Sequence, residues 1–198
     1  MHLNSQLVFR KYAPPCFADY QRVLEIGPDG FPSTYQRAVN NPSLRWETLD
    51  ITDDPRLTYR TRDEYVFPIP SNQFDVVVSA QVIEHVRKTW VWLSEVARVC
   101  KPGGYVITVN PVTWGYHEAP IDCWRIYAEG MRALYDEAGL EVEHCSSEGL
   151  EPWTSQWPAR LRMFRKLLTG GKPPASGWPP VIDTITIGRK PLHQLRVA

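Results

Sequence analysis

The sequence predicts an α/β fold with a doubly wound, mostly parallel sheet, and three observations lead to that prediction. Short runs rich in β-branched and aromatic residues recur along the chain, amphipathic helical patterns separate several of them, and a glycine turn follows the first run. At 198 residues the chain fits a single domain, residues 1–198, which is long enough for a three-layer core.

The predicted elements follow one another in a regular order. A short helix or turn near Phe9 is broken by Pro14-Pro15. Six strands are then expected, at residues 23–26, 44–49, 74–79, 105–109, 140–144 and 182–187. Two helices are expected from apolar residues at i, i+3, i+4 and i+7, namely Leu93, Val96, Ala97 and Cys100, and Met131, Leu134, Tyr135 and Ala138. We expect the second helix to end at Gly139.

Residues 151–180 are expected to form an irregular lid or insertion, because this segment is rich in prolines and tryptophans. Within it, residues 159–168 carry apolar side chains on one helical side and Arg162, Arg165 and Lys166 on the other. Such a helix would pack on the sheet, lie on a membrane surface, cap an anionic substrate or contact a second subunit, so the sequence leaves a homo-oligomer open.

Charge and composition narrow the classes of partner. The formal net charge is zero, which gives no general attraction to nucleic acid or to an anionic membrane. No apolar run is long enough for a transmembrane segment, and residues 1–6 lack the apolar core of a signal peptide, so we expect a cytoplasmic protein. The four cysteines form no C-x-x-C pair, and neither a metal site nor a disulfide framework is expected.

The run from Arg22 to Gly30 is typical of a nucleotide-type cofactor site. Glu25 ends an apolar strand, and Gly27 and Gly30 form a turn that exposes backbone N–H groups to a ligand. The turn departs from the dinucleotide pattern of three glycines, because other residues occupy two of those positions. Asp50 closes the next strand, where a carboxylate accepts hydrogen bonds from a ribose diol.

Four further motifs follow in order: Asp63-Glu64-Tyr65-Val66-Phe67-Pro68, Phe74-Asp75-Val76-Val77-Val78-Ser79, Val82-Ile83-Glu84-His85-Val86 and Lys101-Pro102-Gly103-Gly104. With the glycine turn, they make residues 20–145 resemble the class I S-adenosylmethionine-dependent methyltransferases, of the methyltransferase type 11-like kind. The resemblance implies a Rossmann-like sheet of seven strands, with the last strand an antiparallel insertion at the sheet edge. It also implies S-adenosyl-L-methionine as the cofactor, in preference to a nicotinamide dinucleotide.

The resemblance implies a set of cofactor contacts. Glu25 would meet the ammonium group, with Gly27 and Gly30 giving close backbone approach, and Asp50 with its neighbour Ile51 would bind the ribose. The remaining expected contacts are Asp63 or its neighbour Glu64 at the adenine, Ser79 at the end of the central strand and Tyr12 over the amino-acid end. Residues 80–82, which follow Ser79, would pass beneath the cofactor and offer mostly backbone. Simpler interpretations remain for several of these residues: a packing turn at Gly27, a turn-forming Asp50 and a solvated loop around Asp63.

The acceptor is expected at the segment that follows the fifth strand. Its His117-x-x-Pro120-x-Asp122-x-x-Arg125 pattern resembles a segment of family members linked with polysaccharide or natural-product assembly. We expect His117 to act as general base, with Asp122 orienting it or contacting the acceptor; the alternative is a structural Asp122–Arg125 pair beside an exposed His117. His85 is the second candidate base; the alternative for this residue, which the sequence favours, is a scaffold or helix-start role.

The predicted function is therefore methyl transfer to oxygen or nitrogen of a small molecule or saccharide, a reaction that needs no metal. The alternatives are transfer to a protein, lipid or carbon centre, and a non-catalytic accessory protein that only binds the cofactor.

Overall fold

The computed structural model describes residues 2–118, 120–151 and 181–192. The short helix or turn predicted near Phe9 is the helix α1 (Leu3–Tyr12), and a single 3₁₀ turn, η1 (Pro14–Cys16), follows it at the paired prolines. The predicted lid at residues 151–180, with its basic helix, lies almost entirely outside the described residues. In the part of the chain that the structure describes, no helix is long and apolar enough to span a membrane.

Seven strands form one sheet in the order β3-β2-β1-β4-β5-β7-β6. Their bounds are β1 (Arg22–Ile26), β2 (Arg45–Asp50), β3 (Tyr59–Arg60), β4 (Phe74–Ala80), β5 (Cys100–Pro111), β6 (Glu141–Glu148) and β7 (Asp183–Arg189). The pairs among β1 to β5 are parallel, and β7 runs antiparallel to both of its neighbours. The predicted doubly wound sheet with an antiparallel last strand is thus confirmed.

The last strand lies one position in from the sheet edge. β7 pairs with β5 on one side and with β6 on the other, so β6 forms the edge. Six of the seven β7 residues are buried, which agrees with pairing on both sides. Sequence patterns had also missed β3, which contributes two residues at the opposite edge.

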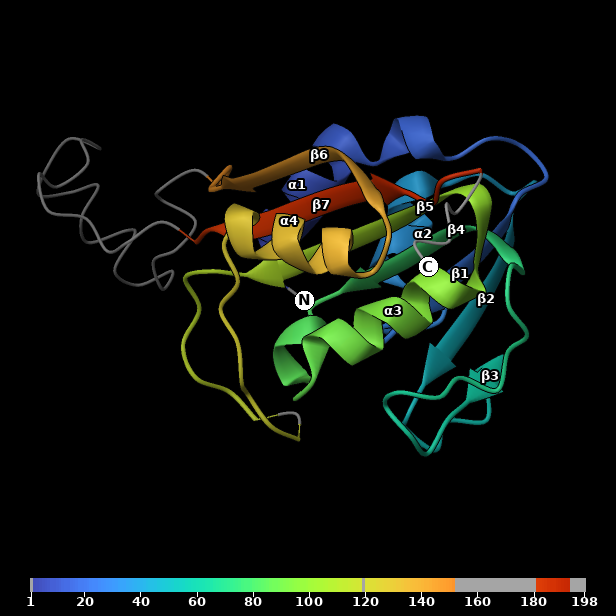
Figure 1. The fold of residues 1–198 in the computed structure, drawn as a ribbon, viewed down its shortest axis with the longest axis horizontal. Helices are drawn as coiled ribbons and strands as arrows, with labels where there is room; N and C mark the ends of the chain where they lie inside the picture. The colour runs from blue at the N-terminus through green and yellow to red at the C-terminus, as the bar shows by residue number, and fades with distance from the viewer. Residues whose placement is uncertain (1, 119, 152–180, 193–198) are drawn as a thin grey trace, which may run out of the picture.

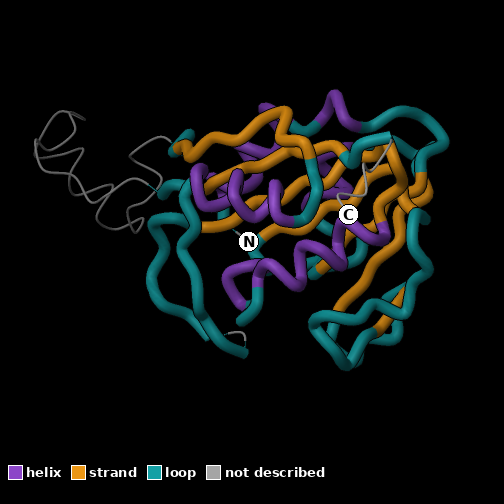
Figure 2. Tube along the Cα trace, in the orientation of Figure 1, coloured by secondary structure: helices purple, strands orange, loops and turns teal. Residues whose placement is uncertain are grey.

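Helices cover both faces of the sheet (Figures 1 and 2). α3 (Thr89–Val99) and α4 (Ala128–Glu137) pack on one face, whereas α1 and the short α2 (Thr34–Val39) pack on the other. Neighbouring strand residues alternate between the two cores: Val23 packs with α1 and α2, and Leu24 with α3 and α4. The second predicted helix ends as expected, with Gly139 at φ +70° just beyond it.

The connections place a cleft at the centre of the sheet. The chain passes from β1 through α2 to β2 on one face, and from β4 through α3 to β5 on the other. The strand order therefore reverses between β1 and β4, and open sheets of this type bind ligands beyond the carboxyl ends of the strands at such a reversal.

Candidate functional site

A cavity of about 600 Å³ opens beyond the carboxyl ends of β1, β2 and β4. Residues of the glycine turn, the end of β2 and the segment after β4 share its lining: Ile26, Gly27, Leu49, Asp50, Ile51, Thr52, Thr61, Glu64, Phe67, Gln81, Val82, His85, Val86, Trp92 and Pro120. It thus combines four residues that the sequence predicted for the cofactor, Gly27, Asp50, Ile51 and Glu64, with one predicted for catalysis, His85.

Gly27 is required by its conformation and by its surroundings. Its φ is +72°, and a Cβ built on it would lie 2.3 Å from Cγ2 of Val82, in the segment after β4. Its N–H donates to the carbonyl of Leu49, 3.0 Å away, which ties the turn to β2. Gly30 lies under no such constraint, since a Cβ there would meet only the Pro32 carbonyl oxygen at 3.8 Å.

Glu25 lies behind the turn and does not line the cavity. Its side chain is 1% exposed and accepts hydrogen bonds from Ser33 Oγ at 2.5 Å and from Trp46 Nε1 at 2.7 Å. Burial raises the pKa of Glu25 to about 7, although both hydrogen bonds act in the opposite direction.

Asp50 is positioned at the cavity by its own turn. Its Oδ1 accepts from the N–H groups of Ile51 and Thr52, at 2.6 and 3.1 Å. Within the described residues Oδ2 has no hydrogen bond, so one oxygen of the carboxylate closes the turn and the other is left without a protein partner.

The structure separates the two acids that follow Thr61. Asp63 is exposed, caps the turn by accepting from the N–H of Tyr65 at 2.8 Å, and does not line the cavity. Glu64 does line it, and its Oε2 is buried with no hydrogen-bond partner among the described residues. Of the two candidate acids, Glu64 therefore lines the cavity and Asp63 does not.

Two other predicted contacts, Ser79 and Tyr12, are not among the residues that line the cavity. Ser79 is buried within β4, where its hydroxyl approaches the carbonyl oxygen of Ile26 at 3.4 Å. Tyr12 donates to Glu148 and stacks on His144, both on β6, with a ring separation of 4.0 Å. Of the segment 80–82 that the sequence places beneath the cofactor, Gln81, with φ +57°, and Val82 line the cavity.

The loop after β5, residues 112–127, is held against η2 (Ile83–His85), the 3₁₀ turn that follows β4. The N–H groups of Cys123 and Trp124 donate to the carbonyl of Glu84, and the Trp124 indole N–H donates to the carbonyl of Val86. His85 Nδ1 contacts the carbonyl of Ile121. The loop thereby covers the His85 end of the cavity.

His117 and Asp122 meet in this loop. Asp122 Oδ2 accepts from the backbone N–H of His117 at 2.8 Å and lies 3.4 Å from Nδ1 of the same residue. Arg125 binds Asp122 through two hydrogen bonds of 2.5 and 2.7 Å, and this holds the pKa of Asp122 well below its usual range. Asp122 therefore forms both interactions that the sequence left open, with Arg125 and with His117.

The rings of His85 and His117 stand edge to face, with centroids 4.9 Å apart. Glu84, next to His85, is 1% exposed, and neither carboxylate oxygen has a hydrogen-bond partner among the described residues. No role was expected for Glu84 from the sequence, although a carboxylate directly after the apolar residues Val82 and Ile83 is a sign of a buried acid.

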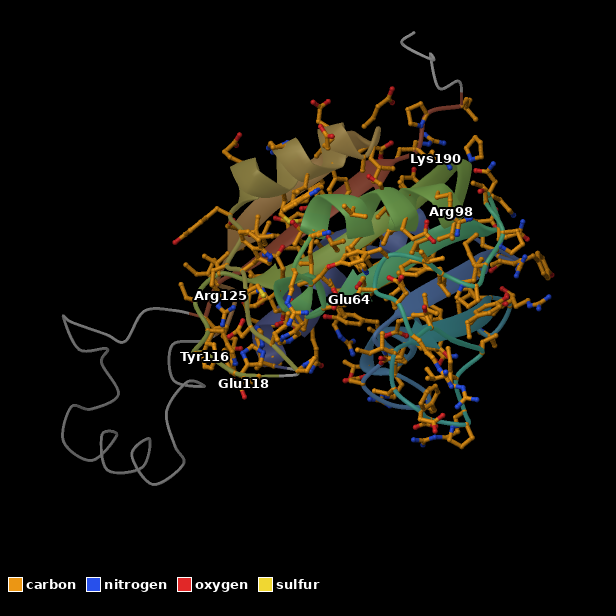
Figure 3. The ribbon with its side chains drawn as sticks, turned by 60° about the horizontal axis from the view of Figure 1, so that its bottom comes forward. Glu64, Arg98, Tyr116, Glu118, Arg125 and Lys190 are labelled. Atoms are coloured by element: carbon orange, nitrogen blue, oxygen red, sulfur yellow. The ribbon has the colours of Figure 1, made fainter. Side chains whose placement is uncertain are left out.

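A second cavity, of about 470 Å³, has different chemistry. Its lining includes Arg98 and Lys190, and in Figure 3 Glu64 lies between these two residues and the loop that carries Tyr116, Glu118 and Arg125. Lys190 Nζ already donates to the carbonyls of Ala97 and Cys100 at 2.8 Å, and Arg98 pairs with Glu95 at 2.6 Å. The two cationic side chains of this second cavity therefore already have partners within the protein.

Comparisons with known proteins agree with the fold and with the family that the sequence resembles. Residues 33–108 match the family model described as a methyltransferase domain. The chain is 30% identical over 119 residues to the uncharacterised protein YafE of Escherichia coli, covering 52% of this chain and 56% of that protein. It is 35% identical over 95 residues to a "Probable S-adenosylmethionine-dependent methyltransferase" of Mycolicibacterium smegmatis, and the match covers 45% of this chain and 37% of that protein.

The chain thus spans about half, or less, of the length of these curated relatives. Among solved structures, phosphoethanolamine N-methyltransferase 2 of Haemonchus contortus in complex with S-adenosyl-L-methionine shares the fold, with a TM-score of 0.61, 17% identity, and coverage of 95% of this chain and 52% of that one. The family match over residues 33–108, the named relative and the sheet order confirm the predicted resemblance to the class I S-adenosylmethionine-dependent methyltransferases.

Proposed function

We propose that the protein binds S-adenosyl-L-methionine in the 600 Å³ cavity and transfers its methyl group to oxygen or nitrogen of a small molecule or saccharide. The observation that carries the proposal is the pair of carboxylate residues Asp50 and Glu64 in the lining of this cavity, which lies at the strand reversal. Asp50 Oδ2 and Glu64 Oε2 are acceptors without partners among the described residues, as the ribose diol and the adenine amino group require.

When bound, the cofactor supplies a methyl group on a sulfonium, which is already activated for displacement. The chain then has to hold the acceptor and remove a proton from a hydroxyl or an ammonium group. His117 is the proposed base, and Asp122 keeps its ring in place. The loop of residues 112–127 supports this role, because it fixes His117 beside His85, a residue of the cavity wall.

The test combines a binding and a transfer measurement on the full chain. Calorimetric titration with S-adenosyl-L-methionine should give one site per chain, and release of S-adenosylhomocysteine should be followed over a panel of saccharides, hydroxylated small molecules, amines, peptides and lipids. Transfer to a saccharide or small molecule supports the proposal, and transfer to peptides or lipids alone contradicts its acceptor class. Binding without transfer to any acceptor would favour an accessory role.

A further inference from the structure

Glu84, His85 and His117 form a cluster of metal-ligating side chains at the end of the cavity. The ligand atoms that these three residues offer all lie within 4.8 Å of one another. Glu84 and His85 belong to η2, whereas His117 belongs to the loop after β5. The cluster therefore exists only in the folded chain, and it could not be predicted from a short cysteine and histidine motif in the sequence.

The acid of this cluster has no electrostatic partner at hydrogen-bond distance. Glu84 is 1% exposed, and both of its carboxylate oxygens lack a hydrogen-bond partner among the described residues. The nearest nitrogen of His85, Nε2, lies 3.8 Å from Oε1. Burying an ionised carboxylate in this way is costly unless a cation or a proton joins it.

Both histidines are oriented so that one ring nitrogen is left for a ligand. His85 Nδ1 contacts the carbonyl of Ile121, and His117 Nδ1 lies 3.1 Å from the carbonyl of Gly115. A carbonyl can only accept, so each Nδ1 carries the hydrogen and each neutral ring presents its Nε2 lone pair. Asp122, 3.4 Å from His117 Nδ1, adds the carboxylate that often supports a metal-bound histidine.

We propose that Glu84, His85 and His117 bind one divalent transition-metal cation of the zinc type, through a carboxylate oxygen and two Nε2 atoms. Two nitrogens and one carboxylate are ligands that such cations prefer over magnesium or calcium. Ligands at about 2.1 Å from one cation stand no more than about 4.2 Å apart. Because one ligand atom of each residue already lies within 4.8 Å of the others, a small movement of the side chains brings all three into reach of one cation.

The cation site does not depend on the proposed methyl transfer, but the two assignments interact at His117. While its Nε2 binds a cation, that nitrogen cannot accept a proton, so one residue cannot fill both roles at once. The competing arrangement is a protonated Glu84 with no cation, because burial raises the pKa of Glu84 to about 8. Direct metal titration separates these two arrangements.

The experiment uses the full chain without an affinity tag, titrated with zinc chloride by calorimetry in chelator-treated buffer. We expect one zinc ion per chain, binding at least tenfold more weakly in Glu84→Gln and in His117→Ala. His144→Ala is the matched control, because His144 is a partly buried histidine on β6 that contacts Tyr12, and zinc affinity should not change. Titration with cobalt chloride should give a visible absorption band that is lost in both cluster variants, and circular dichroism checks their fold.

Absence of zinc binding by the folded wild-type chain, or wild-type affinity in both cluster variants, would overturn the site. The outcome is independent of cofactor binding, which is titrated in parallel. A chain that binds S-adenosyl-L-methionine but no zinc loses only the cation site. A chain that binds zinc at the cluster but no S-adenosyl-L-methionine loses only the proposed function.

Discussion

At the scale of single residues, the carboxylates at and near the cavity differ in whether their oxygens bind the backbone of a turn or are left without a partner. Asp50 uses one oxygen to close its own turn and leaves the other at the cavity. Asp63 uses its side chain for a turn and faces solvent, whereas Glu64 faces the cavity. Residue type alone does not separate these cases, because the direction of each side chain follows from local backbone conformation.

Replacing Asp50 by alanine should weaken cofactor binding and leave the fold intact. Loss of a charge-assisted acceptor typically costs about 1.5–3 kcal/mol, or one to two decades in dissociation constant. Calorimetric titration with S-adenosyl-L-methionine measures the effect, and Asp63→Ala serves as the matched control because Asp63 lies off the cavity. Equal affinity losses in both variants would contradict the assignment of Asp50 to the ribose.

Glu25 should make the protein less stable as the pH rises from about 4.5 to 7. Its folded-state pKa is raised to about 7 from the ordinary value of 4.5, so the native state holds the proton over this window and the unfolded state loses it. The free energy of unfolding therefore falls through the window, by an amount of the order of 3 kcal/mol for the full shift.

Urea unfolding at several pH values tests this sign, with Glu25→Gln as the reference. Other buried carboxylates are the same in both proteins, so the difference between the two curves reports Glu25 alone. A wild-type curve that rises relative to the variant between pH 4.5 and 7 would show that the native state prefers the ionised form.

Replacing His117 by alanine should lower turnover by about 10²–10⁴-fold while cofactor affinity stays unchanged, because a general base acts on the acceptor and not on cofactor binding. Turnover is measured as S-adenosylhomocysteine released with an acceptor found in the screen. His144→Ala is again the control. Near-normal turnover of the folded His117 variant would move the role to His85 or to no residue.

At the scale of elements, the loop of residues 112–127 is the part that assembles the acceptor end. Arg125 joins its two ends, donating to Asp122 and to the carbonyls of Trp114 and Gly115. Asp122 is 2% exposed, so Arg125 is the cation that balances a buried charge.

Arg125→Met should therefore loosen this loop without disturbing the cofactor side. Loss of the Arg125 guanidinium leaves the Asp122 carboxylate without the cation that pairs with it in this partly buried position. We expect faster amide hydrogen exchange in residues 112–127 and a raised KM for the acceptor, with unchanged cofactor affinity. Arg132→Met removes an arginine paired with the exposed Glu129 of α4 and should change none of these quantities. A specific loss of cofactor affinity in the Arg125 variant would contradict this division of roles.

At the scale of the whole molecule, the inserted strand β7 links the antiparallel edge to the parallel sheet. Tyr135 of α4 is fully buried against it, and its hydroxyl hydrogen-bonds Thr108 Oγ1 at 2.9 Å. A Cβ on Gly188 of β7 would lie 2.5 Å from the ring of Tyr135. Glycine at this position lets the helix approach the sheet closely.

Gly188→Ala should destabilise the protein by about 1–3 kcal/mol, the usual cost of overpacking a core. Chemical denaturation measures the change, and cofactor affinity should be kept because Gly188 does not line the cavity. In Gly30→Ala, the added methyl group meets only one carbonyl oxygen at 3.8 Å, so its stability should stay close to that of the wild type. Equal stabilities for the two variants would exclude the packing constraint.

The sequence by itself determined the alternation of strands and helices, the glycine turn at Gly27 and the acid at Asp50, because periodicity and turn chemistry are local properties. Tertiary structure decided that β7 lies one strand in from the sheet edge. It also decided that Glu64 lines the cavity, whereas Asp63, Ser79 and Tyr12 do not. The meeting of Glu84 and His85 with His117 was decided in the same way, since it joins segments about thirty residues apart. Such contacts depend on how the sheet brings distant chain segments together, and no local pattern records that pairing.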